Sequence, residues 1–168
     1  MFYASTADGH RVLHGSVPAL GWEIVGVYMP NTAPRSTAKL DMWRFLTDIA
    51  APALSQRQAL MIGDFNTGLP SLDYRGKTLQ GASDMQRLLD SGWRDAWKAL
   101  HPGDQRPPAS WWSTAGNPFR LDHCFLSPIA PDPGLVEYPT DVDGTATVGR
   151  GGFSDHTPLV VDMPHSFG

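Results

Sequence analysis

The chain has 168 residues, of which 41% are hydrophobic, and its 13 Lys and Arg stand against 17 Asp and Glu for a formal charge of −4. This length is normally one domain that buries roughly 70% of the unfolded chain's surface, so we expect residues 1–168 to form a single globular domain. No apolar run approaches the roughly 20 residues that cross a bilayer, and residues 1–6 lack the charged-then-apolar order of a signal peptide, which predicts a cytoplasmic protein.

The charge and the cysteine content restrict the chemistry. Cys124 is the only cysteine, which excludes an intrachain disulfide and a cysteine-based zinc site, so any metal must bind oxygen or imidazole ligands. The net acidity counts against strong nonspecific DNA binding. A phosphodiester substrate is still compatible with it, because a divalent cation held by clustered carboxylates supplies positive charge locally.

The first half of the chain predicts a hairpin, a strand and a helix in that order. An Asp-Gly turn within residues 7–10 predicts a hairpin between residues 1–6 and 11–13. Residues 22–29 are rich in β-branched and aromatic side chains and predict a strand that ends at Pro30. Apolar residues then recur every third position, which predicts an amphipathic helix behind an N-cap at Ser36 or Thr37; they are Leu40, Trp43, Leu46 and Ile49.

The second half predicts shorter elements. Residues 59–62 read as a buried strand, and a helix is expected to begin at Ser83, with Gln86 completing a capping box, and to end at Gly92. Further strands are predicted at residues 110–113, 121–126 and 159–161, and loops at residues 102–108 and 128–152. Strands mixed with only two or three helices, in no regular alternation, predict an α/β or α+β layered fold.

Polar side chains at the ends of three predicted strands are the candidates for chemistry. Asp64 and Asn66 follow the strand at 59–62 and share one side if the backbone stays extended, so they could bind a hard cation and orient a water together. The alternative is an Asx turn after a strand. Asp122 lies in a strand that alternates inward and outward side chains, where a solvated or capping carboxylate is the alternative. Asp155 and His156 stand directly before a strand, an arrangement that needs more than a simple turn to explain it.

Several other residues have simpler structural explanations. His10 and His14 are four apart, but the turn beside them favours exposed histidines over a metal site. We expect Asp95 to be a structural hydrogen-bonding residue. Trp93 and Trp97 are expected to pack in the core, whereas four aromatic residues could contact an unstacked base: Trp111, Trp112, Phe119 and Phe153. For Trp111, burial in the sheet is an equal alternative.

Six short motifs together resemble one family. They are Tyr28-Met29-Pro30-Asn31, Gly63-Asp64-Phe65-Asn66, Gly92-Trp93-Arg94-Asp95-Ala96-Trp97, Ser110-Trp111-Trp112-Ser113, Arg120-Leu121-Asp122-His123 and Ser154-Asp155-His156. In this order they resemble the late motifs of the endonuclease/exonuclease/phosphatase superfamily, in its exonuclease III and AP endonuclease branch. The resemblance runs from about Trp22 to the C-terminus. It implies a layered β-sandwich of the DNase I-like type, flanked by helices.

The resemblance also implies a role for each matched residue. The residue at Asp64 would orient and deprotonate the attacking water, and that at Asn66 would help to hold the water and the scissile phosphate. His156 would contact the phosphate oxygens, with Asp122 fixing its orientation and protonation. Asp155, with Asp64 and Asn66, would bind Mg²⁺ or Mn²⁺. Three residues would lie at the phosphate or at the floor of the site: Tyr28, Asn31 and Trp112.

One departure from the family pattern bears on function. The family's domain begins with strands that carry an Asn and then a metal-ligand Glu, and this chain starts after both, which predicts an N-terminally shortened sandwich with an unpaired edge. Three consequences are open: a homodimer that covers this surface, a rearranged smaller sandwich, or a natural N-terminal loss that retains activity with a different ligand set. Three hypotheses follow: a metal-dependent DNA phosphodiesterase of exonuclease or abasic-site endonuclease type, a phosphatase of the same superfamily acting on a small phosphoester, or a non-catalytic remnant that serves as an interaction module.

Overall fold

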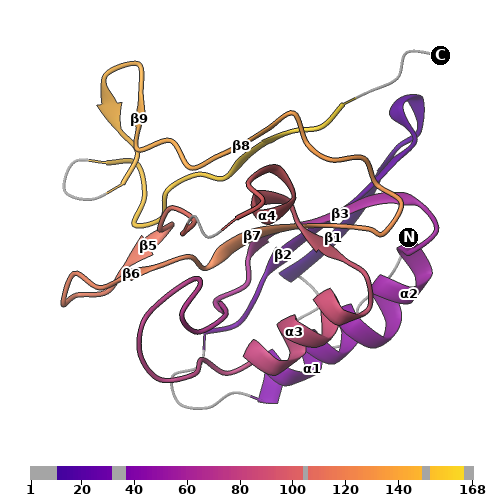
Figure 1. The fold of residues 1–168 in the computed structure, drawn as a ribbon, viewed down its shortest axis with the longest axis horizontal. Helices are drawn as coiled ribbons and strands as arrows, with labels where there is room; N and C mark the ends of the chain where they lie inside the picture. Colours follow the sequence, from indigo (N-terminus) through magenta and orange to yellow (C-terminus); the bar gives the residue numbers. More distant parts are fainter. Residues whose placement is uncertain (1–10, 32–36, 104–105, 149–151, 165–168) are drawn as a thin grey trace.

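A computed structural model describes residues 11–31, 37–103, 106–148 and 152–164. A mixed five-stranded sheet forms its centre, with the strand order β1-β2-β3-β7-β4 (Figure 1). Strands β2 and β3 are parallel, and the other neighbours are antiparallel. The bounds are β1 Val12–Val17, β2 Trp22–Tyr28, β3 Gln58–Asp64, β7 Asp122–Leu126 and β4 Arg94–Asp95.

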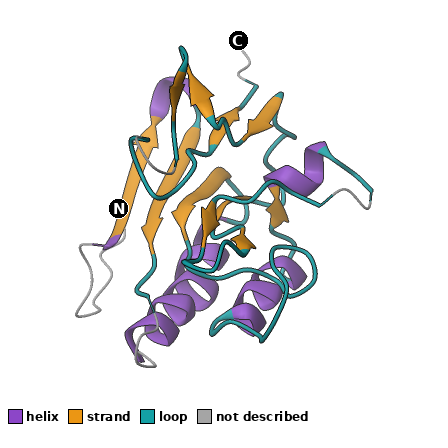
Figure 2. Ribbon diagram, turned by 90° about the vertical axis from the view of Figure 1, so that its left-hand side faces the viewer, coloured by secondary structure: helices purple, strands orange, loops and turns teal. Residues whose placement is uncertain are grey.

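Helices cover one face of this sheet, as Figures 1 and 2 show. Helix α1 (Thr37–Phe45) continues through the π-helical turn η3 (Leu46–Ala50) into α2 (Ala51–Leu54), and α3 (Ala82–Asp90) packs beside α1. The amphipathic pattern therefore predicted this helix correctly, although the helical segment continues to Leu54. Its buried side chains include Met42, Trp43 and Leu46, which pack on Val25, Val27 and Met61 of the sheet.

The predicted capping box at Ser83 is wrong. Helix α3 begins at Ala82, and its N-cap is Gly81 at φ 93°, with no side-chain cap bond. A Cβ at Gly81 would lie 2.4 Å from Nε1 of Trp43, so the entry to the helix is fixed by close packing against α1. Glycine permits both the left-handed backbone and this close approach.

The other face of the sheet is covered by α4 (Ala96–Leu100) and by a two-stranded antiparallel ribbon of β8 (Leu135–Glu137) and β11 (Val160–Asp162) (Figure 1). A second apolar cluster lies between these layers and includes Leu60, Cys124, Leu126 and Val136. Successive side chains of a strand point to opposite faces of the sheet. Alternate residues of the central strands therefore pack in the helix-side cluster and in this second cluster. The layered α/β architecture predicted from the sequence is confirmed.

The remaining elements are short. Strands β5 (Trp111–Trp112) and β6 (Pro118–Phe119) pair with each other, as do β9 (Asp141–Val142) and β10 (Thr145–Ala146). Between Pro18 and Leu20 lies the 3-10 turn η2. The prediction that residues 128–152 form only a loop is wrong, because β8, β9 and β10 lie there. The hairpin predicted around residues 7–10 falls outside the described residues. No helix in the described part of the chain has the length and apolar character needed to cross a membrane.

Candidate active site

Three site residues stand in one row across the central sheet. Tyr28 at the end of β2 pairs with Asp64 at the end of β3, and Asp64 pairs with Asp122 at the start of β7. These residues share the strand parity of Ile24, Ile62 and Cys124, so all three point to the face covered by the β8 and β11 ribbon. The strand register therefore brings Asp64 and Asp122 together from positions 58 residues apart in the chain.

Gly63 makes this row possible. It adopts φ 142°, and a Cβ there would lie 2.0 Å from the carbonyl oxygen of Val27 on the neighbouring strand. Any side chain would push β2 and β3 apart directly beside the pairing of Tyr28 with Asp64. This close approach explains the glycine that precedes Asp64.

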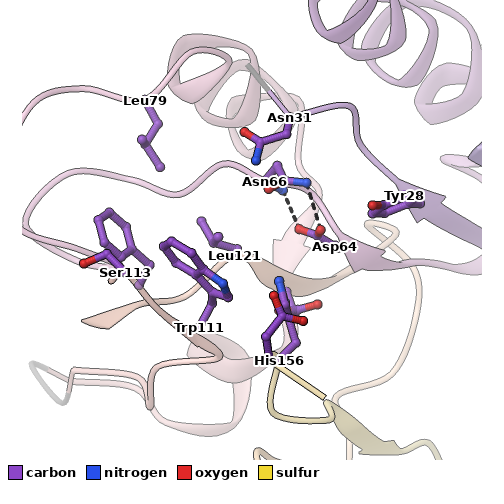
Figure 3. A pocket seen from close by; sticks show the side chains of 12 residues that line it. Tyr28, Asn31, Asp64, Asn66, Leu79, Trp111, Ser113, Leu121 and His156 are labelled. Carbon is purple, nitrogen blue, oxygen red and sulfur yellow. Dashed lines mark hydrogen bonds and ion pairs between the residues drawn. The ribbon is translucent and has the colours of Figure 1, made fainter. Parts of the chain in front are cut away.

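Asp64 and Asn66 form an Asx turn and an acid-amide pair at the same time. The backbone N–H of Asn66, a residue at φ 45°, donates to Oδ1 of Asp64 at 2.7 Å. Its side-chain Nδ2 donates to Oδ2 of Asp64 at 2.8 Å, as Figure 3 shows. The same Nδ2 donates to the carbonyl oxygen of Met29, also at 2.8 Å. Both amide hydrogens are thus used, which leaves Oδ1 of Asn66 as the atom for a water or a cation. The Asx turn that the sequence offered as an alternative is therefore present.

The environment of Asp64 suits a proton acceptor. Burial raises the pKa of Asp64 to about 6, the hydrogen bond from Asn66 opposes the rise, and the neighbouring Asp122 charge adds to it. A carboxylate with a pKa close to neutral pH can take up a proton during a reaction and release it afterwards.

Lys39 is a charged residue of the site that sequence reasoning missed. Its side chain is 1% exposed, and Nζ donates to the carbonyl oxygen of Asn66. Burial lowers the pKa of Lys39 to about 8, and the charge of Asp64 opposes this effect. The buried lysine thus holds the backbone of Asn66 through this hydrogen bond, and its charge is close enough to Asp64 for the two to interact. The available signal was its position four residues before Trp43, on the buried face of the amphipathic helix.

His156 is oriented by Asp122. Nδ1 of His156 lies 2.7 Å from Oδ2 of Asp122. This hydrogen bond raises the pKa of His156, burial opposes the rise, and the charges of Asp122, Asp64 and Asp155 add to it. With Nδ1 turned to Asp122, Nε2 is the ring atom left for a substrate.

Ser110 joins the two segments that carry this pair. Its hydroxyl oxygen accepts hydrogen bonds from the backbone N–H groups of Leu121 and Asp122, at 2.9 and 3.1 Å. Its carbonyl oxygen accepts from the N–H of Thr157, at 2.8 Å. Ser110 therefore holds the start of β7 through its hydroxyl and the segment after His156 through its backbone carbonyl.

A cavity of about 610 Å³ unites these groups (Figure 3). One part of its lining is polar and contains Tyr28, Asn31, Asp64, Asn66, Ser113, Asp122, Asp155 and His156. The other part is apolar and contains Leu79, Trp111, Phe119 and Leu121. The structure thus brings together every predicted site residue except one.

The exception is Trp112. It is 37% exposed and lies outside the residues that line the cavity, whereas Trp111 lines it. Neighbouring residues of a strand point to opposite sides, so only one of the two tryptophans can face the site. The placement expected for Trp112 is corrected in favour of Trp111.

Carboxylates and imidazole in this cavity could hold a metal ion. Within the described ranges, Asp64, Asp122 and His156 each offer a ligand atom, and these atoms all lie within 4.8 Å of one another. Asp155, which sequence comparison with the family pattern predicts as a ligand, is exposed and lines the same cavity. Oxygen donors with one imidazole suit a hard divalent cation such as Mg²⁺ or Mn²⁺.

A buried ion-pair cluster stabilises the start of β7. Arg120 donates to Asp73 at 2.7 Å and to both carboxylate oxygens of Asp95 at 3.1 and 2.6 Å. Asp95 also accepts from the N–H of Lys98 as the N-cap of α4. The structural role predicted for Asp95 is thus seen in its contacts. These bonds hold Arg120, which lies two positions before Asp122, in a fixed place.

The exposure predicted for His14 is wrong. Its side chain is 6% exposed, and Nε2 lies 2.7 Å from Oε2 of Glu23 on the adjacent strand. The contact arises because β1 extends to Val17, so His14 lies within a strand that pairs with β2. His10 lies outside the described residues.

Comparison with known proteins agrees with this geometry. The family model described as Endonuclease/Exonuclease/phosphatase family matches residues 5–156. The chain therefore belongs to this family. No curated protein sequence matches the chain.

Solved structures share the fold at low sequence identity. The 3′-5′ exonuclease NExo from Neisseria meningitidis is 22% identical, with a TM-score of 0.70 over 91% of this chain and 64% of that one. The 3′ phosphatase NExo from Neisseria, bound to product DNA hairpin, is 20% identical, with a TM-score of 0.69 over 92% and 65%. An AP endonuclease from Archaeoglobus fulgidus is 17% identical, with a TM-score of 0.73 over 97% and 69%.

These likenesses establish the DNase I-like fold. The chain spans about two thirds of the length of these structures, from 64% to 69%. The class of fold predicted from the six motifs is confirmed, as is the superfamily.

Proposed function

We propose that this chain is a Mg²⁺- or Mn²⁺-dependent phosphodiester hydrolase that acts on DNA by in-line attack of an activated water. The observation that carries the proposal is the convergence of Asp64, Asn66, Asp122 and His156 on one cavity from three distant segments. An exonuclease and an AP endonuclease among the similar structures support a DNA substrate.

Asp64 is the proposed general base. Its carboxylate accepts a proton from the attacking water, and Oδ1 of Asn66 accepts the second hydrogen bond of that water. The oxygen of the water then bonds to phosphorus while the bond to the leaving oxygen breaks on the opposite side, and the leaving oxygen takes up a proton from solvent water. The pKa of about 6 at Asp64 leaves it ionised at neutral pH and still basic enough to take the proton.

His156 is the proposed electrophilic group at the phosphate. Its raised pKa favours the protonated ring, whose Nε2–H would donate to a non-bridging phosphate oxygen as charge accumulates there. Asp122 keeps the ring in place through Nδ1. Tyr28 and Asn31 are proposed to bind phosphate oxygens at the mouth of the cavity.

Asp155, with Asp64 and Asn66, is proposed to hold the divalent cation. The cation would supply neutralising charge to the phosphate oxygens. This matters because the polar lining contains three carboxylates, which would otherwise repel an anionic substrate.

The test compares three substrates: abasic-site duplex, blunt duplex and bis-p-nitrophenyl phosphate, each with Mg²⁺, Mn²⁺ or EDTA. Asp64→Ala and His156→Ala should each lower kcat by about 100-fold or more on every substrate that the wild type cleaves. Asp90→Ala is the matched control, because Asp90 is an exposed carboxylate at the end of α3 that bonds only to Gln86 among the described contacts. Metal-dependent DNA cleavage that both active-site variants lose would support the proposal.

Two other outcomes favour the alternatives. Cleavage of the small ester alone would favour a phosphatase for small phosphoesters, the reading that the net charge of −4 supports. No cleavage of any substrate would favour a non-catalytic interaction module. We also propose a homodimer, and light scattering would test this by measuring the mass of the particle in solution.

A further inference from the structure

The cavity that contains Asp64 and His156 is the catalytic cavity of the proposed function. A second cavity, of about 440 Å³, lies next to it. The two are separated by a pair of aromatic rings. Phe119 lines the catalytic cavity, and its ring stacks on Tyr74 at a centroid distance of 5.6 Å and an interplanar angle of 21°. Tyr74 lines the second cavity. A chain-like ligand could therefore pass over one ring pair from the first cavity into the second.

The lining of the second cavity is positively charged. Arg75 and Arg106 both line it, and both are exposed. Asp73 is the one acid among the described residues of the lining, and both of its oxygens are engaged. Oδ1 accepts from Arg120 at 2.7 Å, and Oδ2 accepts from the N–H of Leu69 at 2.6 Å.

This charge contrasts with that of the catalytic cavity, which three aspartates line. The chain as a whole is acidic, so two guanidinium groups at one cavity are a local departure from the average. Guanidinium groups bind phosphate through paired, charge-assisted hydrogen bonds. The second cavity is called the arginine cavity after Arg75 and Arg106, which line it. These two residues make it suitable for a phosphate group.

The walls of the arginine cavity are held by hydrogen bonds. The hydroxyl of Tyr74 accepts from the N–H of Leu79, a residue that lines the catalytic cavity, at 2.8 Å. The carbonyl of Tyr74 accepts from the N–H of Ser71 at 2.9 Å, and Nη2 of Arg106 donates to the carbonyl of Ser71 at 3.3 Å. One hydrogen-bonded loop therefore connects the arginine cavity with the catalytic cavity.

We propose that the arginine cavity binds a second phosphate of a polynucleotide whose scissile phosphate occupies the catalytic cavity. This inference rests on the proposed hydrolase function and narrows its substrate to a polymer, because a small phosphoester cannot occupy both cavities. The partly exposed ring of Phe119, which stacks on the buried ring of Tyr74, would lie along the sugar or base between the two phosphates, where aromatic contacts tolerate any sequence.

The test uses Arg75→Met and Arg106→Met, singly and together, and Arg44→Met as the control that removes one exposed positive charge from α1. Fluorescence anisotropy with a labelled oligonucleotide measures binding at several salt concentrations. Each cavity variant should weaken DNA binding by about tenfold and lower the slope of log K against log salt by about 1. The rate on bis-p-nitrophenyl phosphate should stay within twofold of the wild type.

Each result decides the question. Equal losses on DNA and on the small ester, unchanged DNA affinity, or a loss matched by Arg44→Met would each overturn the proposal. Arg75→Lys and Arg106→Lys should recover part of the affinity, since they keep the charge without the planar fork. A wild type that cleaves nothing would refute the hydrolase function, and the anisotropy measurements would still decide whether the arginine cavity binds polynucleotide.

Discussion

Replacing Arg120 by Met should destabilise the protein far more than replacing an exposed arginine. The Arg120 side chain is 2% exposed, and it is the counter-charge of Asp73 and Asp95, whose side chains are 1% and 9% exposed. Removing one partner of a buried ion pair costs about 3–5 kcal/mol, because the remaining carboxylates keep a charge in a poorly hydrated site or must bind protons. Arg44→Met, which loses only a surface pair with Asp41, should cost at most about 1 kcal/mol.

The pH dependence of the free energy of unfolding provides a sharper check. Burial opposes the ionisation of Asp95, but the charge of Arg120 outweighs it and holds the pKa of Asp95 well below its ordinary value of 3.8. In the wild type, Asp95 therefore stabilises the fold above about pH 4, and this contribution is lost as the pH falls through the lower, folded-state pKa. Without Arg120, burial should raise the pKa of Asp95 above its unfolded value, so the variant should lose stability as the pH rises.

Urea unfolding of Arg120→Met, Arg44→Met and the wild type at pH 5 and pH 7 measures both effects. We expect the cost of Arg120→Met to be larger at pH 7 than at pH 5, and the midpoint of thermal unfolding at pH 7 to fall by about 6–20 °C for a chain of this length. A cost below about 1 kcal/mol, or one that is larger at pH 5 than at pH 7, would refute the assignment of Arg120 as the counter-charge.

Three further predictions concern the catalytic cavity. Lys39→Met should lower kcat by about tenfold or more with KM within twofold, because the support behind the acid-amide pair is lost while the substrate-binding walls stay; steady-state kinetics and a melting curve separate this from unfolding. In the metal-free protein, Asp122→Asn should lower the pKa of His156, followed by NMR titration of the ring, since the hydrogen bond to Asp122 is the main cause of its rise; an unchanged titration would contradict that cause. Trp111→Ala should raise KM for DNA by about tenfold, and Trp112→Ala by less than twofold, because only Trp111 lines the cavity; equal effects in a KM comparison would refute the placement.

The sequence predicts the row of Tyr28, Asp64 and Asp122 well because these residues occur at strand ends within short, recognisable motifs. The strand before Asp64 contains a continuous apolar run, and the strand that contains Asp122 ends in three apolar residues, so the existence of both was predictable. Their register was not, because the pairing of Asp64 with Asp122 depends on contacts across 58 positions. The order of the six motifs predicted this pairing indirectly, through the resemblance to the family.

Other features escaped prediction for physical reasons. The choice between Trp111 and Trp112 depends on which side of β5 faces the cavity, and two adjacent tryptophans give no parity signal. Lys39 was missed because lysine is usually exposed on a helix, although its position four residues before Trp43 places it on the buried face; its bond to the carbonyl oxygen of Asn66 depends on the fold.

The short strands β9 and β10 did carry a local signal. Asp143 and Gly144, at φ 51° and 78°, form the two-residue turn between them. Asp-Gly is a strong hairpin sequence, but strands of two residues are too short to show a periodic pattern. The same brevity hid α4, which spans only Ala96–Leu100.

The row of Tyr28, Asp64 and Asp122 separates two tasks that many enzymes combine in their loops. Backbone ladders of the central sheet fix the spacing of these side chains, whereas Trp111, Arg75 and Arg106 belong to peripheral segments that border them. Exchange of those peripheral segments with other members of the family should alter which molecules are accepted and leave the arrangement of the acids intact. Under the proposed function, substrate choice could therefore be redesigned one loop at a time on this sheet.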